Sequence, residues 1–411
     1  MFPGVKPSTS LKGQNHLTMP GDGSVKVFRA INELEEVRAA WETWPGNRDS
    51  EMESYLDFLQ ANPSILRPHV IVVYRSGQPD AMLVGRIDKG KVVCRLGYFH
   101  LDLPARTLCF VYGAFRGSES LENSTILVAS VMESLRDGEA DVAYMNFLRE
   151  DSDLFRQSVA QPSLFCRDYA RIRQPHFAIK LPGSAEEYHK GLSSNARWQA
   201  KSKQKKLMKD FAGDVEVRCF KDKSEVEILA QDAERIAKMS YQRGLGVGFA
   251  DSPSMRDALR LKAERGWLRA YVLYLGKKPA AFWIGDINGA TFGSDFLAYD
   301  TEFAKYSPGM FLIVKVIEGF CDAKSDGVTT IDFATGHAQY KEALSNEGWQ
   351  EIAVNIFAPT AKGMLLNLVR SSVGWIDQIA KNVLARTTLL NRIKKAWRNH
   401  AKPKQAMNEV S

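Results

Sequence analysis

The chain has 411 residues, of which 45% are hydrophobic and 25% are charged, and its net charge is +7. This composition is ordinary for a globular protein, and the length suits two or three domains, each with its own core. Five widely spaced cysteines argue against a disulfide framework and a zinc site of paired cysteines. No apolar run approaches the roughly 20 residues of a membrane span, and the N-terminus lacks a signal-peptide layout, so we expect a cytoplasmic protein.

The first part of the chain is predicted to form a tail and one domain. Residues 1–24 are rich in Pro, Gly, Ser and Thr and have no apolar period, which predicts a disordered tail. Residues 25–182 show alternating strand and helix patterns. The predicted helices cover 31–44, 51–60 and 121–136, and the predicted strands cover 69–75, 80–88, 91–98, 107–113, 141–147 and parts of 164–180.

The second part, residues 183–360, is predicted to form a similar domain. Its predicted helices cover 185–192, 193–211, 224–243, 254–265, 308–324 and 337–345, around a Gly-rich segment at 244–253. Its predicted strands cover 214–219, 268–275, 279–287, 290–299, 328–333 and 350–357. Parallel and antiparallel strands mixed with a few helices predict an α+β fold. Residues 361–411 form a basic tail whose amphipathic helical part, 361–400, carries an apolar stripe through Leu365, Leu368, Ser372, Ile376, Ile379 and Val383.

An internal repeat supports two similar domains. Residues 70–90 resemble 270–290, and residues 128–147 resemble 313–333, each pair with the same order of apolar runs and turns. The copies differ on both sides of the matching helix. The second copy has Tyr306-Ser307-Pro308-Gly309 before it and Asp332-Phe333-Ala334-Thr335-Gly336 after it, where the first has Leu121-Glu122-Asn123-Ser124 and Asn146-Phe147-Leu148-Arg149. The second copy is therefore predicted to hold the chemistry.

The loop before the 308–324 helix has the features of an anion site. Pro308 suits a helix start because its missing N–H would be unpaired there, and Gly309 lets the backbone approach a ligand closely. The free N–H groups of the first turn and the helix dipole attract an anion such as a pyrophosphate. A plain strand-to-helix turn explains the same residues, so both interpretations stand on spacing alone.

The run 331–341 adds a polar cluster after the next strand. Asp332 lies near the strand end, Gly336 opens the backbone, and Tyr340 and Lys341 follow on the next turn. Asp332 could equally be a cap or an ion-pair partner of Lys341, and Tyr340 a half-buried core aromatic.

These motifs together carry a resemblance to a known family. Tyr-Ser-Pro-Gly, a helix, Asp-Phe-x-x-Gly-x-x-x-Tyr-Lys and the later Trp349 resemble the GNAT-type acyltransferases of the CelD/BcsL family of cellulose and exopolysaccharide biosynthesis, over about residues 185–355. The basic segment that starts at Leu192-Ser193-Ser194-Asn195-Ala196-Arg197 is similar to the helix that opens that family's domain. The duplication resembles FemABX-type peptidyltransferases, which contain two GNAT-like domains.

The resemblance implies two tandem GNAT-like domains and direct acyl transfer from acetyl-CoA or another acyl-CoA, without a metal. It implies that a splayed strand pair holds the acyl-CoA and that Tyr306, Ser307, Pro308, Gly309 and Met310 carry its pyrophosphate. The candidate general bases are Asp295, Asp332 and His337, and the candidate proton donor to the leaving thiolate is Tyr340. Asp295 could equally be a strand-surface charge, and His337 a solvated loop residue. Arg197 and Lys341 are candidates for substrate binding.

Two basic segments predict anionic partners. Residues 192–209 hold six Lys or Arg and no acidic residue. They are interpreted as a solvated face, as a phosphate-binding wall or as an RNA-binding surface, the last with only Trp198 for stacking. Residues 362–404 hold ten Lys or Arg against Asp377. Their helix either packs on the domain or makes a peripheral contact with anionic lipid through 361–400 at the inner membrane face.

The sequence therefore predicts a degenerate first domain and a second domain that acylates a cell-envelope or exopolysaccharide precursor, a small-molecule or glycan acceptor. One alternative is FemABX-like transfer from aminoacyl-tRNA. The other is a catalytically inactive, membrane-peripheral scaffold of polysaccharide assembly.

Overall fold

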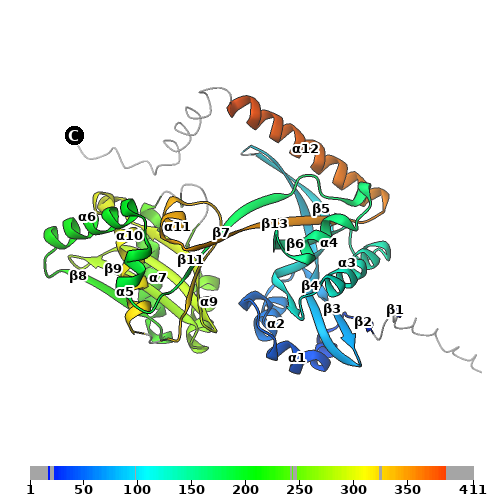
Figure 1. Cartoon of the computed structure of the whole chain (residues 1–411), viewed down its shortest axis with the longest axis horizontal. Coiled ribbons are helices and arrows are strands. Elements are labelled where there is room, and N and C mark those ends of the chain that lie inside the picture. The colour runs from blue at the N-terminus through cyan, green and yellow to red at the C-terminus, as the bar shows by residue number, and fades with distance from the viewer. Residues whose placement is uncertain are drawn as a thin grey trace, which may run out of the picture. The chain divides into compact units, whose positions relative to one another are not determined.

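The structure is a computed structural model that describes residues 17–18, 23–97, 99–240, 243, 248–323 and 326–385. The chain divides into two compact units (Figure 1). Unit 1 comprises Met1–Arg173 and Ile352–Lys381, and unit 2 comprises Gln174–Glu351 and Asn382–Ser411. Both units combine a mixed sheet with helices, which confirms the predicted α+β class. Most of the predicted tail 1–24, part of the Gly-rich segment 244–253 and the tail beyond residue 385 lie outside the described residues.

Unit 1 is built on a sheet in the order β1-β2-β3-β4-β5-β6-β13. Neighbouring strands from β1 to β5 are antiparallel, and β5 pairs with β6 in parallel. The strands are β1 (Leu17–Thr18), β2 (Gly23–Phe28), β3 (Ile65–Arg75), β4 (Gln78–Leu96), β5 (Phe99–Gly117), β6 (Val142–Arg149) and, from residue 352, β13 (Glu347–Phe357). The helices are α1 (Arg38–Thr43), α2 (Met52–Ala61), α3 (Leu121–Arg136), α4 (Asp153–Ala160) and α12 (Ala361–Ala385).

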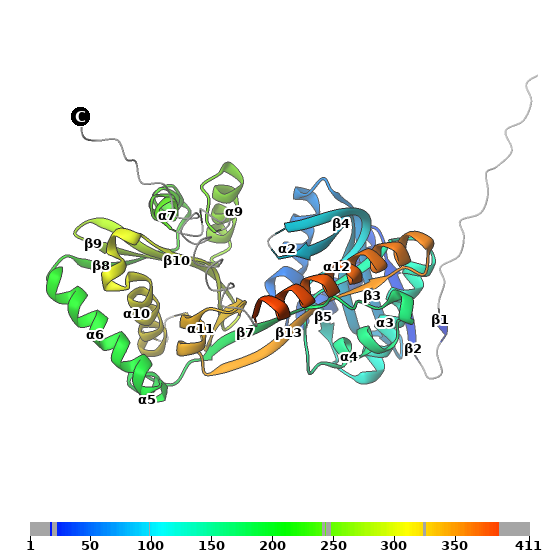
Figure 2. The ribbon, with the colours of Figure 1, turned by 90° about the horizontal axis from the view of Figure 1, so that it is seen from above.

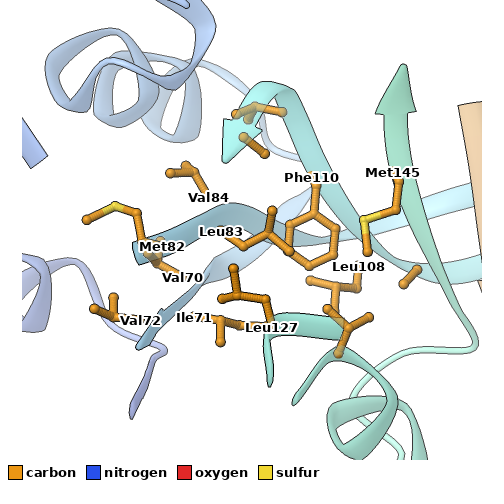
Figure 3. Close-up of a cluster of buried hydrophobic side chains, with 14 of the residues drawn as sticks. Val70, Ile71, Val72, Met82, Leu83, Val84, Leu108, Phe110, Leu127 and Met145 are labelled. Atoms are coloured by element: carbon orange, nitrogen blue, oxygen red, sulfur yellow. The ribbon is translucent and has the colours of Figure 1, made fainter. Parts of the chain in front are cut away.

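The core of unit 1 lies between this sheet and its helices (Figure 3). Val70, Leu83, Phe110 and Leu127 are among its fully or almost fully buried side chains. The long runs of consecutive apolar residues in β3 and β4 fit strands that are covered on both faces.

Two sequence predictions for unit 1 were wrong. Residues 80–88 and 91–98 do not form separate strands, because Gly90 continues the ladder opposite Ala105 within β4. A side chain at Gly90 would meet Thr107 at 2.5 Å, so glycine is used there for close strand approach and not for a turn. Strand β2 begins at Gly23, inside the predicted tail, and was missed.

Unit 2 has a sheet in the order β7-β12-β11-β10-β9-β8. The strands are β7 (Ile172–Lys180), β8 (Val215–Phe220), β9 (Leu268–Leu275), β10 (Lys278–Asn288), β11 (Thr291–Tyr299) and β12 (Thr330–Thr335). The helices are α5 (Ala185–Gly191), α6 (Ser194–Asp210), α7 (Val226–Met239), α9 (Pro253–Glu264), α10 (Pro308–Ala323) and α11 (Gln339–Leu344), with a 3-10 turn, η5 (Thr301–Tyr306), before α10.

Helices cover both faces of the unit 2 sheet (Figure 2). Helices α5, α6 and α10 pack on one face, around Trp283, Phe292 and Phe333. Helices α7 and α9 pack on the other face, around Phe282 and Ile284. Alternate residues of a strand face opposite sides, so each strand of the site supplies side chains to both layers.

Each repeat ends in a strand that joins the other unit's sheet. Strand β7 closes the first repeat, yet its residues 178–180 pair with β12 in unit 2. Strand β13 closes the second repeat, yet from Ile352 onward it belongs to unit 1 beside β6. The units are thus built from interleaved stretches of chain. No helix among the described residues is both long enough and apolar enough to cross a bilayer.

Candidate active site

Strands β11 and β12 of unit 2 run in parallel and pair over three residues. Thr291, Phe292 and Gly293 lie opposite Thr330, Ile331 and Asp332, and the recorded pairing ends there. Both strands continue, β11 to Tyr299 and β12 to Thr335. Beyond the last pair, the edge of β11 that faces β12 is therefore available to an extended ligand, which could bond to the backbone as an added strand does.

A β-bulge lies at the start of the unpaired part of β11. Ile284 is opposite Phe296 and Gly285 is opposite Ser294, so Asp295 is the extra residue. A bulge redirects the side chain it contains. The Asp295 carboxylate pairs with Lys262 of α9 at 2.6 Å, and the same ammonium contacts Asp286 at 2.7 Å. Asp295 thus neutralises a largely buried lysine.

The predicted pyrophosphate loop lies between β11 and α10. Tyr306 is buried, and its hydroxyl donates to Asp210 of α6 at 3.0 Å. Ser307 adopts a left-handed conformation with φ 53°. Helix α10 then begins at Pro308, with Gly309 buried against the Tyr299 ring and Met310 half-buried. The first turn of α10 contains no acidic residue, so no carboxylate in that turn would repel an anion bound to its backbone N–H groups.

Two lysines flank this loop. The ammonium of Lys206, from α6, lies 5.7 Å from the centroid of the Tyr306 ring, and that of Lys305 lies 4.8 Å from it. The Phe211 ring meets the Tyr306 ring edge-on, 5.2 Å between centroids. The basic helix is therefore anchored next to the start of α10, which favours the interpretation of this segment as a phosphate-binding wall.

At the end of β12, Asp332 holds the turn that follows. Its Oδ1 accepts from the backbone N–H of Ala334 at 2.6 Å and from Nε2 of His176 at 2.6 Å. Ala334 is left-handed, with φ 58°. Lys341 donates to the carbonyl oxygens of Ala334 at 3.3 Å and Thr335 at 2.9 Å. Burial lowers the pKa of the Lys341 ammonium, and the nearby Asp332 charge opposes this effect.

His176 of β7 is the centre of a buried charged cluster. Its Nε2 contacts Asp332 at 2.6 Å, and its Nδ1 contacts Glu351 at 3.1 Å. The indole N–H of Trp349 donates to Glu351 at 2.8 Å, and the indole stacks on the imidazole with 4.3 Å between centroids. Burial alone would lower the pKa of His176, but the hydrogen bonds to Asp332 and Glu351 raise it to about 9. The imidazole is therefore a cation at neutral pH.

The charged groups of this cluster differ in exposure. The His176 side chain is 1% exposed and that of Glu351 is 4% exposed, whereas the Asp332 side chain is 26% exposed. Both recorded hydrogen bonds of Asp332 use Oδ1, so Oδ2 is the oxygen that can face an acceptor. The cluster presents a carboxylate, held by a buried cation, at the point where β11 and β12 diverge.

The remaining predicted site residues have other surroundings. Tyr340 packs edge-on against Phe333, with 5.8 Å between ring centroids. His337 is 65% exposed and lies 3.5 Å from Glu342. Arg197 donates to the carbonyl oxygens of Lys190 and Leu192, at the end of α5. The structure thus brings Asp332 together with Lys341 and His176, and it places Asp295, His337 and Arg197 in separate contacts.

His176 and Glu351 were missed as functional candidates by sequence reasoning. His176 lies 156 residues from Asp332 in the chain, and its partners come from two other strands. A local motif cannot show such a cluster. The only sequence signal was the alternation along this strand, which puts His176 on the same face as Ala178 and on the face opposite Ile179.

The sequence of this region matches a known family. Residues 194–342, from the start of α6 into α11, match the acetyltransferase (GNAT) domain. This part of the chain is similar to GNAT acetyltransferases. The predicted enzyme class is confirmed, and this GNAT domain contains both diverging strands, the start of α10, and Asp332. Strand β7 and the segment with Glu351 lie outside the matched residues.

Three solved structures are similar to this chain over most of its length. FemX superposes with a TM-score of 0.51 and 10% identity, over 82% of this chain and 98% of that chain. The C-terminal domain of a putative lysylphosphatidylglycerol synthetase from Agrobacterium fabrum gives 0.46 and 11%, over 84% and 95%. A tandem GNAT protein from the clavulanic acid biosynthesis pathway gives 0.42 and 12%, over 82% and 99%. A search of the curated proteins found no match. The likeness to FemX confirms the predicted two-domain GNAT-like fold.

Proposed function

We propose that unit 2 transfers an acyl group from acyl-CoA directly to an amine or hydroxyl of an acceptor. The divergence of β11 and β12 next to the uncharged first turn of α10 is the observation that carries this proposal. The pantetheine arm would add to the open edge of β11, and the pyrophosphate would lie at the first turn of α10. Lys206 and Lys305 add positive charge beside that position.

The reaction needs one base and one acid. The acceptor nitrogen or oxygen attacks the thioester carbonyl carbon, the new bond forms, and the carbon–sulfur bond breaks. Asp332 takes the proton from the acceptor, directly or through water, and the Tyr340 hydroxyl supplies a proton to the leaving thiolate. A backbone N–H of the open β11 edge would polarise the carbonyl oxygen. We favour Asp332 over Asp295 because Asp332 lies at the last β11–β12 pair, where the strands diverge, and over His337 because that side chain is largely exposed.

The acceptor that we propose is a cell-envelope or exopolysaccharide precursor. The motif from Tyr306 to Lys341 and its resemblance to the CelD/BcsL family support this class of acceptor. A peripheral contact of residues 361–400 with an anionic membrane would bring the domain to a lipid-linked precursor.

Calorimetric titration of the full chain with CoA, acetyl-CoA and tRNA tests the cofactor. We expect both CoA compounds to bind, and Gly309→Glu to weaken binding roughly 100-fold, because a carboxylate would occupy the position of the pyrophosphate. Ser254→Glu is the control for an added carboxylate, since Ser254 is also the second residue of a helix that begins with proline, and equal thermal unfolding of both variants would exclude misfolding at the buried Gly309. Absence of binding by every CoA compound, or binding of tRNA alone, would refute the proposal.

Turnover of the Tyr340→Phe variant tests the proton donor. The phenyl ring keeps the edge-on contact with Phe333, and thermal unfolding of the variant would show whether the fold is retained. We expect kcat for CoA release, quantified by chromatography with a panel of amino sugars as acceptors, to fall at least about tenfold. Unchanged turnover would show that another group protonates the thiolate.

A further inference from the structure

Helix α12 of unit 1 carries one buried and one exposed set of apolar side chains. Leu366, Val369 and Val373 pack on β4 and β5. The exposed set flanks the buried one around the helix and is 39–69% exposed; it consists of Met364, Leu365, Leu368, Trp375, Ile376 and Ile379. The stripe found in the sequence is therefore the outward face of the helix, and the helix packs on its unit through a different stripe.

Two other segments of unit 1 adjoin α12 and also expose large apolar side chains. The end of the β4–β5 hairpin carries Leu96, Phe99 and Leu101, and the backbone N–H of Gly97 donates to Asp377 of α12 at 2.7 Å. The segment after α4 carries Leu164, Phe165 and Tyr169, and the amide of Asn367 donates to the Phe165 carbonyl oxygen at 2.8 Å. Figure 1 shows α12 along the edge of this unit, beside the end of the hairpin. We call these three segments together the α12 face.

The α12 face contains the most exposed aromatic side chains of the described residues. Phe99 is 81% exposed, Phe165 is 73% exposed and Trp375 is 69% exposed. Single exposed apolar residues are normal on a protein surface, but a contiguous set marks a contact site. Aromatic residues at the rim of an exposed aliphatic stripe are typical of surfaces that insert into the interfacial region of a bilayer.

The positive charge of the chain is concentrated in its C-terminal sequence. Residues 361–411 hold ten Lys or Arg against Asp377 and Glu409, a net charge of +8, while the whole chain carries +7. Seven of these basic residues follow residue 385, directly after α12. The chain that continues from the α12 face is therefore strongly cationic.

The acidic residues within the α12 face are neutralised. Segments 95–101, 164–171 and 361–381 contain two of them, Asp168 and Asp377. The Asp168 side chain is 0% exposed and contacts Arg370 at 3.4 Å. The Asp377 side chain is 13% exposed and pairs with Lys381 at 2.6 Å. Neither carboxylate would repel an anionic surface.

We propose that the α12 face docks unit 1 on the surface of an anionic lipid bilayer. The outward stripe of α12, Phe99 and Phe165 enter the interfacial region, and the basic residues after α12 attract the anionic headgroups. A second copy of this chain fits the face less well, because the sequence that follows α12 is strongly cationic in both copies and like charges repel. This inference deepens the membrane contact of the proposed function by naming its surface, and it holds whether or not unit 2 is active.

Co-sedimentation of the full chain with lipid vesicles tests this docking. One vesicle preparation is phosphatidylcholine alone, and the other contains about a third phosphatidylglycerol, enough to give a negative surface potential. The stripe variant is Leu368→Gln with Ile376→Gln. The control is Leu121→Gln with Ile228→Gln, two side chains of similar exposure on α3 and α7. A third protein ends at Ala385.

We expect the wild type and the control to bind the anionic vesicles equally, more weakly as ionic strength rises, and to bind phosphatidylcholine poorly. The stripe variant should bind at least about tenfold more weakly, because two large apolar side chains leave the interface. The protein that ends at Ala385 should lose the preference for anionic lipid.

Each of four results would overturn the proposal. The first is equal vesicle binding by the stripe variant and the wild type. The second is unchanged preference for anionic lipid in the protein that ends at Ala385. The third is a wild type that does not bind vesicles. The fourth is a stripe variant whose only change is the loss of a dimer in light scattering. Equal thermal unfolding of all four proteins would exclude misfolding as the cause.

Discussion

The two units use the same strand-to-helix junction in opposite ways. In unit 1, three residues separate β5 from α3, and the Ser120 hydroxyl accepts from the N–H of Asn123 at 3.1 Å. Glu122 lies in the first turn and pairs with Arg75 at 2.9 Å. The start of α3 is thus capped by its own side chains and made acidic. An incoming pyrophosphate would meet a carboxylate.

In unit 2, eight residues separate β11 from α10. Asp300 caps the 3-10 turn and not the helix, and α10 opens with Pro308 and Gly309 after the left-handed Ser307. Lys206 and Lys305 lie nearby. The comparison teaches that the same junction can be a structural cap or a candidate anion site, according to which side chains occupy the first turn of the helix.

The strand after each helix shows a second contrast. In unit 1, Asn146 accepts a hydrogen bond from the Tyr144 hydroxyl at 3.4 Å. Asp332, at the matching position of unit 2, is held by the His176 cation. A neutral amide cannot act as a base, so only unit 2 has the carboxylate that the proposed chemistry requires.

Replacing this carboxylate should have the largest effect of the changes that test the comparison. We expect Asp332→Asn to lower kcat for acyl transfer by about 100-fold to 10,000-fold, the range typical of a lost general base. Asn146→Ala in unit 1 should leave kcat unchanged. Steady-state rates with acetyl-CoA and an accepted amine provide the measurement, and an equal loss in both variants would contradict the division of roles between the units.

The two buried histidines should give opposite pH dependences of stability. The pKa of His176 is raised to about 9, so its stabilisation is complete below the unfolded value of about 6.5 and is lost as pH rises toward 9, by up to about 3 kcal/mol. Burial lowers the pKa of His69 in unit 1, so its contribution is lost as pH falls below about 6.5.

Urea unfolding from pH 5 to pH 9.5 measures both effects. His176→Gln should remove the decline on the alkaline side, and His69→Gln should remove the decline on the acidic side. If His176→Gln leaves the alkaline decline unchanged, the ion cluster with Asp332 and Glu351 does not form as described.

A smaller effect is expected from the lysine that holds the turn after β12. Lys341→Met keeps the aliphatic stem but removes two charge-assisted hydrogen bonds, so the free energy of unfolding should fall by about 1–2 kcal/mol. Lys278→Met, at an exposed lysine of the same unit, should change it by less than about 0.5 kcal/mol. Equal effects in denaturant unfolding would show that Lys341 does not stabilise the turn.

The smallest expected effects concern the two helix starts. Ser120→Ala removes the cap of α3 and should destabilise the protein by about 1 kcal/mol. Ser307→Gly removes the strain of a left-handed serine before α10 and should raise the free energy of unfolding of the protein by up to about 1 kcal/mol. Denaturant midpoints would show both, and a stabilising Ser120→Ala would contradict the description of α3 as side-chain capped.

Sequence patterns predicted the repeat, most strands and the helices α3, α7 and α10, because local periodicity determines these. The start of α10 could be found since Pro308 and Gly309 are adjacent in sequence. The His176 cluster could not, because β7, β12 and the segment with Glu351 meet only through strand exchange between the repeats. The partner of Asp295, Lys262, comes from another helix and was equally invisible.

Hydrogen exchange with and without CoA tests the account most directly, because it observes both junctions in one protein. We predict that CoA slows exchange of the backbone amides in 294–299 of β11 and at Gly309 and Met310, while the amides of 110–117 and of the first turn of α3 exchange at unchanged rates. Protection at the start of α3, or no protection at the start of α10, would contradict the claim that only unit 2 binds the cofactor.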